Sequence, residues 1–147
     1  MTEFGGEESF TAPPDRLFAL LTDLDQLAAT IPDLVSSERS DERTLKCVVK
    51  PGFSFLRGTL KLSITLADLQ PSESAAMDVA AQGIGVAMHI VSQLRIAAED
   101  DGSRLTWTAR IERMSGLVAT ISPALVRAAA DRTVRHAWQQ VRTRLGE

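Results

Sequence analysis

The sequence contains few of the residues on which several classes of protein depend. Its 147 residues include one cysteine, Cys47, two histidines and no tyrosine. One cysteine excludes an internal disulfide, and two histidines with one cysteine cannot readily build a closed zinc site. Long apolar runs are also missing, because the longest nearly apolar stretch, residues 83–91, is too short to span a bilayer.

Positive charge is scarce as well. The chain has 16 Lys and Arg against 19 Asp and Glu, a net charge of -3, whereas proteins held by the nucleic-acid backbone are usually basic. The acidic start of the chain has no apolar region and is no signal peptide. With 44% hydrophobic and 24% charged residues, we expect one soluble, cytoplasmic domain over residues 1–147 that binds no nucleic acid.

The first part of the chain changes from strand to helix spacing. Residues 9–12 predict a short first strand, which Pro13-Pro14 ends. Residues 15–21 then have apolar positions on one helical face, and Asp23 is a suitable N-cap for a second short helix over residues 24–30.

Between residues 34 and 113 the apolar residues recur with period 2. Turn signals at Pro51-Gly52, Gly83 and residues 100–103 separate the segments, which predicts antiparallel strands with one apolar and one wet face. Lys61, Ser63, His89 and Arg110 are expected to face water. The apolar face is expected to include Leu60, Leu62, Ile64, Met77, Val79, Met88, Ile90, Trp107, Ala109 and Ile111.

Residues 116–147 are the candidate for a long helix that covers this face. Ser122-Pro123 interrupts its apolar pattern, so the segment is either one helix kinked at Pro123 or a short turn followed by the main helix. A curved sheet around a helix leaves a wedge, and small or flexible residues such as Ala81, Met88 and Ala109 leave room in it. Either Phe53, Phe55, Trp107 and Trp138 fill this room, or it is a ligand cavity.

Candidate nucleophiles and bases are few. Cys47 lies in an apolar row, as is typical of a small buried hydrophobe. His89 is expected on the wet face of its strand, and His136 on the polar side of the last helix. Neither has a Cys or His at ligand spacing, so we expect no metal.

The other polar candidates have simple structural explanations. Asp23 and Asp25 fit helix capping better than a catalytic carboxylate pair. Ser92 and Arg113 are the polar residues whose parity points inward. We therefore expect no catalytic residues and no cofactor. Five arginines of the last helix either form a solvated face or a ridge for anionic headgroups or an acidic partner, namely Arg127, Arg132, Arg135, Arg142 and Arg144.

Several short motifs, in order along nearly the whole chain, carry a resemblance to a known family. They are Phe10-Thr11-Ala12-Pro13, Ile31-Pro32, Gly58, Gly83-Ile84-Gly85, Leu105-Thr106-Trp107 and Ser115-Gly116-Leu117. In this order the sequence resembles the carbon monoxide dehydrogenase CoxG-like family of the START/polyketide-cyclase-like (SRPBCC) superfamily. Asp33 departs from the Ile-Pro-Gly of many members.

The resemblance implies an α+β helix-grip fold, in which a curved antiparallel sheet wraps around a long C-terminal helix and two short helices follow the first strand. It also implies a non-enzymatic carrier of an apolar ligand, a quinone or lipid, accessory to a carbon monoxide dehydrogenase or other molybdenum hydroxylase, with transient contact at the inner face of the membrane and no constitutive anchor. The alternatives are a small cyclase- or hydrolase-like enzyme that uses the same cavity, and an interaction module with a filled core.

The predicted sites follow from this arrangement. The cavity mouth, or the contact with membrane or partner, is expected at Phe53, Phe55, Leu56, Gly116 and Pro123. The ligand cavity is expected to be lined by Met77, Val79, Ala81, Met88, Ile90, Trp107, Ala109, Ile111, Ile121 and Leu125.

Overall fold

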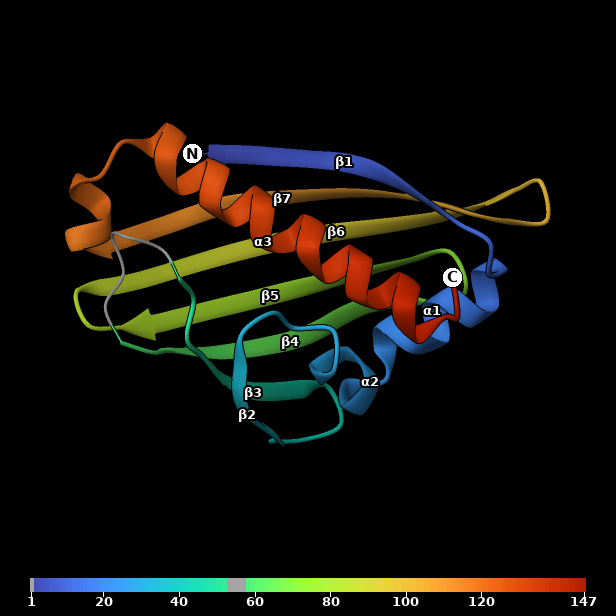
Figure 1. Ribbon diagram of the computed structural model, residues 1–147, viewed down its shortest axis with the longest axis horizontal. Coiled ribbons are helices and arrows are strands. Elements are labelled where there is room, and N and C mark those ends of the chain that lie inside the picture. The colour runs from blue at the N-terminus through green and yellow to red at the C-terminus, as the bar shows by residue number, and fades with distance from the viewer. Residues whose placement is uncertain (1, 53–57) are drawn as a thin grey trace.

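The computed structural model describes residues 2–52 and 58–147. In these residues seven antiparallel strands form one sheet in the order β1-β7-β6-β5-β4-β3-β2, and a long helix crosses one face of it (Figure 1). The elements are β1 (Thr2–Phe10), α1 (Pro14–Thr22), α2 (Leu24–Ala28), β2 (Leu34–Arg39), β3 (Thr44–Val49), β4 (Leu60–Gln70), β5 (Ser74–Gly83), β6 (Val86–Glu99), β7 (Gly102–Gly116), the 3-10 turn η1 (Leu117–Thr120) and α3 (Pro123–Arg144).

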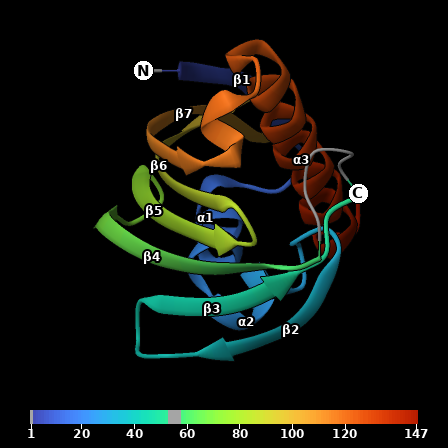
Figure 2. The same ribbon diagram turned by 90° about the vertical axis from the view of Figure 1, so that its left-hand side faces the viewer.

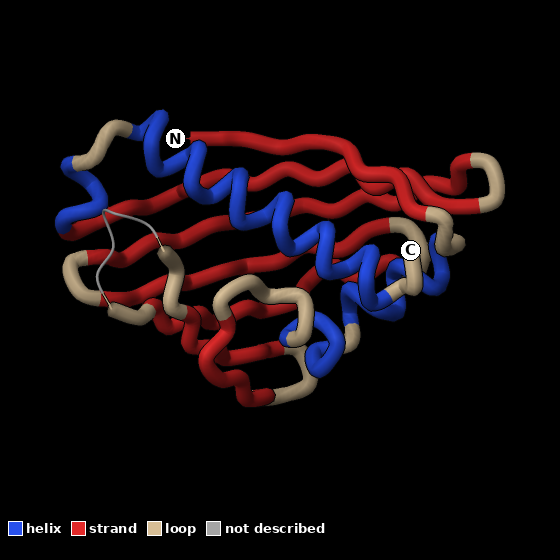
Figure 3. The backbone as a smooth tube through the Cα atoms, in the orientation of Figure 1, coloured by secondary structure: helices blue, strands red, loops and turns tan. Residues whose placement is uncertain are grey.

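The sheet curves around α3, as the end view in Figure 2 shows. Helices α1 and α2 lie together at one end of the sheet, beside the end of α3 (Figure 3). This confirms the predicted helix-grip fold. The predicted cap is also confirmed, because Asp23 Oδ1 accepts hydrogen bonds from the backbone N–H groups of Asp25 and Gln26, at 3.0 and 3.3 Å.

The apolar and wet faces of the sheet are assigned correctly by the period-2 pattern. Leu60, Ile64 and Ile111 are buried, whereas Lys61 and Arg110 are exposed. Trp107 is 1% exposed and forms the centre of the core together with Phe4 and Trp138. Their rings meet edge-on or tilted, with centroids 5.9 and 6.2 Å from that of Trp107.

The prediction for the first strand is wrong in its bounds, since the strand runs from Thr2 to Phe10 and not over residues 9–12. Its alternation is hidden because Gly5 and Gly6 occupy positions where side chains would mark the two faces. Gly5 is required by its neighbour, since a Cβ there would lie 2.5 Å from the carbonyl oxygen of Trp107. Pairing along β7, from Thr2 with Ile111 to Phe10 with Ser103, makes this segment a strand.

The connection into α3 takes the second of the two predicted forms. The turn η1 follows β7, and α3 begins at Pro123, where the missing N–H costs nothing in the first turn. Ser122 occupies the N-cap position but its side chain makes no capping hydrogen bond.

The other end of α3 is tied to the chain that follows β1. The Glu147 carboxylate accepts hydrogen bonds from the N–H groups of Thr11 and Ala12, at 2.9 and 3.3 Å. Arg142 pairs with Glu8 at 3.2 Å, and its guanidinium lies 4.8 Å from the centroid of the Phe10 ring. Helix α3 is therefore held most firmly at its C-terminal end. Among the described residues, no helix combines the length and apolar character needed to cross a membrane.

A β-bulge changes the direction of side chains near the end of β7. Ile90 of β6 pairs with Ile111, but the preceding residue, His89, pairs with Arg113. Glu112 is the extra residue, and beyond it the inward and outward positions exchange. Arg113, whose parity predicts an inward position, is therefore exposed, and Met114 is half-buried in its place.

Asp33, the departure from the family motif, has a φ of 59°. This left-handed conformation is strained for residues with a Cβ, and aspartate tolerates it better than most. We expect Asp33→Gly to raise the free energy of unfolding by up to about 1 kcal/mol and Asp33→Ala to lower it by a similar amount. Urea unfolding of both variants measures this. An Ala variant as stable as the Gly variant would contradict the role assigned to backbone strain.

Candidate functional site

A cavity of about 290 Å³ lies between α3 and the concave face of the sheet. The inner faces of β4, β5 and β6 form its floor, and α3 forms its roof with Val126, Ala130 and Val134. Residues 30–33, between α2 and β2, close one side together with Pro51. The cavity exists because the roof is largely built of alanine, which leaves space opposite the sheet.

Seven of the ten predicted cavity residues line it: Met77, Val79, Ala81, Met88, Ile90, Trp107 and Ala109. The remaining three do not. Ile111 is buried in the core beyond the cavity, Ile121 is half-buried before α3, and Leu125 is 49% exposed on the first turn of α3. The assignment of the seven to ligand binding stays a prediction.

Sequence reasoning missed the roof and one side of the cavity. The roof residues Ala129, Ala130, Thr133 and Ala137 recur every three to four positions along α3. This spacing is a usable signal, but small residues do not stand out in a search for an apolar stripe. The pattern from Thr30 to Asp33 indicates only the end of a helix.

The hydroxyl groups of the lining are already engaged by the backbone. Ser92, Thr30 and Thr133 donate to the carbonyl oxygens of Thr108, Leu27 and Ala129, at 2.8, 2.7 and 3.0 Å. Asp33 is the one charged residue of the lining, and it is exposed at the edge. The lining therefore offers an apolar molecule a dry surface and offers a substrate no converging acid and base.

The indole N–H groups of Trp107 and Trp138 are the exception, since both are buried without a hydrogen-bond partner. Both rings line the cavity. Trp107 Nε1 lies on the side of Gly6 and Arg135, because a Cβ at Gly6 would be 3.3 Å from it.

The family model of the carbon monoxide dehydrogenase component CoxG matches residues 6–146. The chain belongs to the CoxG family. No curated protein matches its sequence.

Solved structures share the fold of this CoxG-family chain at low sequence identity. A conserved protein from Geobacillus kaustophilus has a TM-score of 0.91 at 17% identity, over 99% of this chain and 95% of that one. Ara h 8.0201 has a TM-score of 0.74 at 15% identity, over 99% of both chains. XoxI from Bacillus cereus has a TM-score of 0.72 at 11% identity, over 97% of this chain and 94% of that one. These identities support the fold alone.

The predicted cavity mouth is not brought together at the cavity. Gly116 and Pro123 do not line it, and Phe53, Phe55 and Leu56 lie outside the described residues. Gly116 has a φ of 81°, and a Cβ there would lie 2.6 Å from the carbonyl oxygen of Gly85. Glycine is therefore required where β7 meets the β5–β6 turn, and it does not serve to loosen the start of α3.

The predicted arginine ridge on α3 is largely used within the domain. Arg135 pairs with Asp131 at 2.8 Å, and Arg142 pairs with Glu8. Asp131 raises the pKa of Arg135 through this hydrogen bond. Arg127 and Arg144, at opposite ends of α3, are exposed. A continuous cationic surface along the helix is therefore not available.

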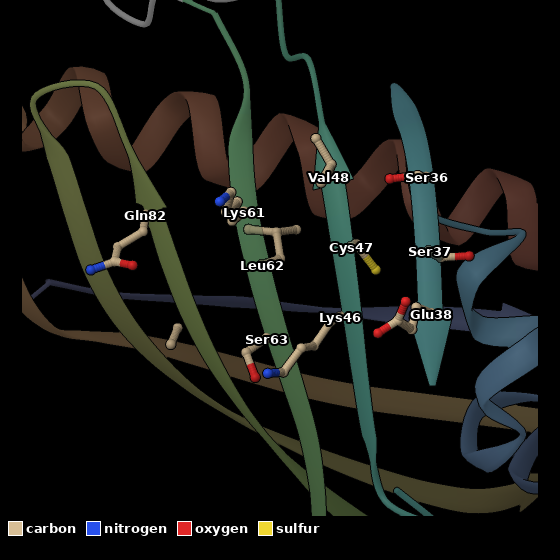
Figure 4. Close-up of a pocket in the computed structure, with 11 residues that line it drawn as sticks. Ser36, Ser37, Glu38, Lys46, Cys47, Val48, Lys61, Leu62, Ser63 and Gln82 are labelled. Carbon is tan, nitrogen blue, oxygen red and sulfur yellow. The ribbon is translucent and has the colours of Figure 1, made fainter. Parts of the chain in front are cut away.

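A second, shallower pocket lies on the outer face of the sheet, over β2–β5, with α3 behind the strands (Figure 4). Its volume is about 430 Å³, and Lys46, Lys61, Ser63 and Gln82 line it together with Glu38. Charges of both signs and open walls distinguish it from the apolar cavity. It contains no predicted cavity residue.

Cys47 and the histidines do not form a reactive site. His89 Nε2 lies 2.7 Å from Asp78 Oδ1 on the outer face, and His136 is exposed. No cluster of metal-ligating side chains occurs in residues 2–52 and 58–147. Cys47 is 3% exposed in a cluster with Leu45 and Ile64.

Burial raises the pKa of the Cys47 thiol from its ordinary value of 9.0 to about 11. We expect the native chain to react very slowly with a thiol reagent at pH 8 and the denatured chain to react at once. The unfolded thiol ionises first, so the stability contributed by this group is complete below pH 9 and is lost as the pH rises to about 11. Fast labelling of the native chain at pH 8 would contradict the burial of this residue.

Proposed function

We propose that this CoxG-family domain binds an uncharged, elongated apolar molecule in the cavity beneath α3 and carries it without transforming it. The ligand classes that fit are quinones and lipids. The recipient is a carbon monoxide dehydrogenase or another molybdenum hydroxylase at the inner face of the cell membrane. The observation that supports the proposal is the lining, which is aliphatic and aromatic and whose hydroxyl groups are engaged by the backbone.

The lining favours uncharged ligands for an energetic reason. Burying about 200 Å² of apolar ligand surface contributes roughly 5 kcal/mol before association costs. A buried charge without a partner costs several kcal/mol, and the only charged residue of the lining, Asp33, would repel an anion. Met77 and Met88 are flexible, which suits ligands of differing shape.

The test is competition for a lipophilic fluorescent probe bound to the purified domain, preceded by native mass spectrometry of the ligands that co-purify with it. Quinones should displace the probe. A fatty-acid methyl ester should displace it at least about tenfold better than the free acid of the same chain at neutral pH, since only the acid carries a charge into the cavity.

Two results would overturn the proposal. Equal displacement by ester and acid would mean that the probe does not report on the apolar cavity. Hydrolysis of the bound ester, or turnover of a polyketide-like compound, would support the cyclase- or hydrolase-like alternative. The lining offers that alternative no acid–base pair.

A further inference from the structure

One end of the domain presents apolar side chains to water. Ile84, in the turn between β5 and β6, is 72% exposed, and Leu125, on the first turn of α3, is 49% exposed. Figures 1 and 2 show this turn, η1 and the start of α3 at the same end of the molecule. We call residues 83–86 and 113–127 the apolar tip. A third exposed aliphatic residue, Val35, lies away from it on the edge strand β2.

The apolar tip is also the end of the domain without carboxylates. Three stretches of the sequence contain no Asp or Glu, namely residues 43–67, 79–98 and 113–130. The strand ends and turns that belong to them meet at this tip. Exposed cations in these stretches include Lys50, Lys61, Arg113 and Arg127.

The opposite end of the sheet is acidic. Its turns and strand ends carry Asp41, Glu42, Asp68, Glu73, Glu99, Asp100 and Asp101. Arg104 is held there by Glu99. The domain therefore has a charge asymmetry along its strands, although its net charge is negative. Near an anionic surface, this asymmetry would orient the apolar tip toward the surface.

We infer that the apolar tip docks on an anionic lipid bilayer, with Ile84 and Leu125 in the headgroup region and Arg113 and Arg127 beside the lipid phosphates. The inference rests on the proposed function, because it gives a carrier the surface by which it reaches the membrane. Binding of an apolar molecule in the cavity does not depend on it, so the two can fail separately.

The area of the tip favours a bilayer over a protein partner. A stable protein interface buries roughly 1,200–2,000 Å² in all, and two separated aliphatic side chains make only a small part of that. Membrane attachment at a surface instead requires a few inserted apolar groups together with cations near the phosphates. The tip has both.

The experiment is co-sedimentation of the full chain with vesicles of phosphatidylcholine, alone or with phosphatidylglycerol. Wild type should bind the anionic vesicles and bind pure phosphatidylcholine far less. The double variant Ile84→Ser/Leu125→Ser should lose at least about tenfold in binding, and Val35→Ser, equally exposed but away from the tip, should bind as wild type does. Arg113→Gln and Arg127→Gln should each lose about fivefold, whereas Arg95→Gln, at the acidic end, should not.

Each outcome decides between the alternatives. Undiminished binding of the Ile84/Leu125 variant, an equal loss in Val35→Ser, or equal binding to both kinds of vesicle overturns the docking inference. A self-association in sedimentation velocity that the double variant abolishes overturns it in favour of a second copy of the chain. Probe binding in the cavity without vesicle binding removes the docking inference alone, and vesicle binding without probe binding removes the proposed function alone.

Discussion

Trp107→Ala is expected to lower the free energy of unfolding by about 4 kcal/mol. The side chain is 1% exposed and packs between Phe4 and Trp138, so its removal leaves a void that three elements line. Small domains are stable by only about 5–15 kcal/mol. The variant should therefore unfold at a much lower urea concentration, as followed by circular dichroism. A loss below about 1 kcal/mol would mean that the ring is not part of the core.

Trp107→Phe separates the ring from its N–H group. The indole N–H is buried without a partner, and an unsatisfied buried donor costs about 1–3 kcal/mol. Removing it offsets part of the packing lost with the smaller ring. We expect this variant to lose less than half of what Trp107→Ala loses, measured in the same urea titration. An equal loss in both variants would mean that the orphan N–H carries no penalty.

The sheet could be predicted from the sequence because its strands bury one face and expose the other. Alternation of apolar and polar residues identifies such strands wherever pairing is regular. The prediction fails at Arg113 because the bulge at Glu112 exchanges the two faces, and no residue type there marks a bulge. It fails at β1 because two glycines stand where alternation would be visible, and pairing with β7 decides the structure.

The cavity could be predicted only in part for a similar reason. The floor follows from strand alternation, which identifies Met77, Val79 and Ala81. The roof depends on the rotation of α3 about its axis. Residues one position apart on a helix point about 100° apart, so Val126 lines the cavity and the neighbouring Leu125 is exposed. That rotation is set by packing of Trp138 and Val141 in the core, which the sequence pattern alone does not give.

Ala81→Phe is expected to weaken binding of the lipophilic probe at least about tenfold while the domain still unfolds cooperatively. Ala81 is 4% exposed on the cavity floor, opposite Leu62 of β4 and Met88 of β6. A phenyl ring there would occupy a large part of the 290 Å³ cavity. Because the ring enters existing space, the cost in stability should stay within about 1–3 kcal/mol. Ala109→Phe, on β7, should block the cavity from another strand.

Ala80→Phe is the matched control for this substitution, since the residue is next to Ala81 on β5 but is exposed on the outer face, at the second pocket. Its ring adds the same volume to the same strand without entering the cavity, so probe binding should equal that of wild type. Fluorescence titration of the three variants, with unfolding curves for each, makes the comparison. Unchanged binding in both Ala81→Phe and Ala109→Phe would place the ligand outside the cavity. Loss of binding in Ala80→Phe alone would place it in the outer pocket, where the polar walls and the lysines at positions 46 and 61 favour a ligand of different chemistry.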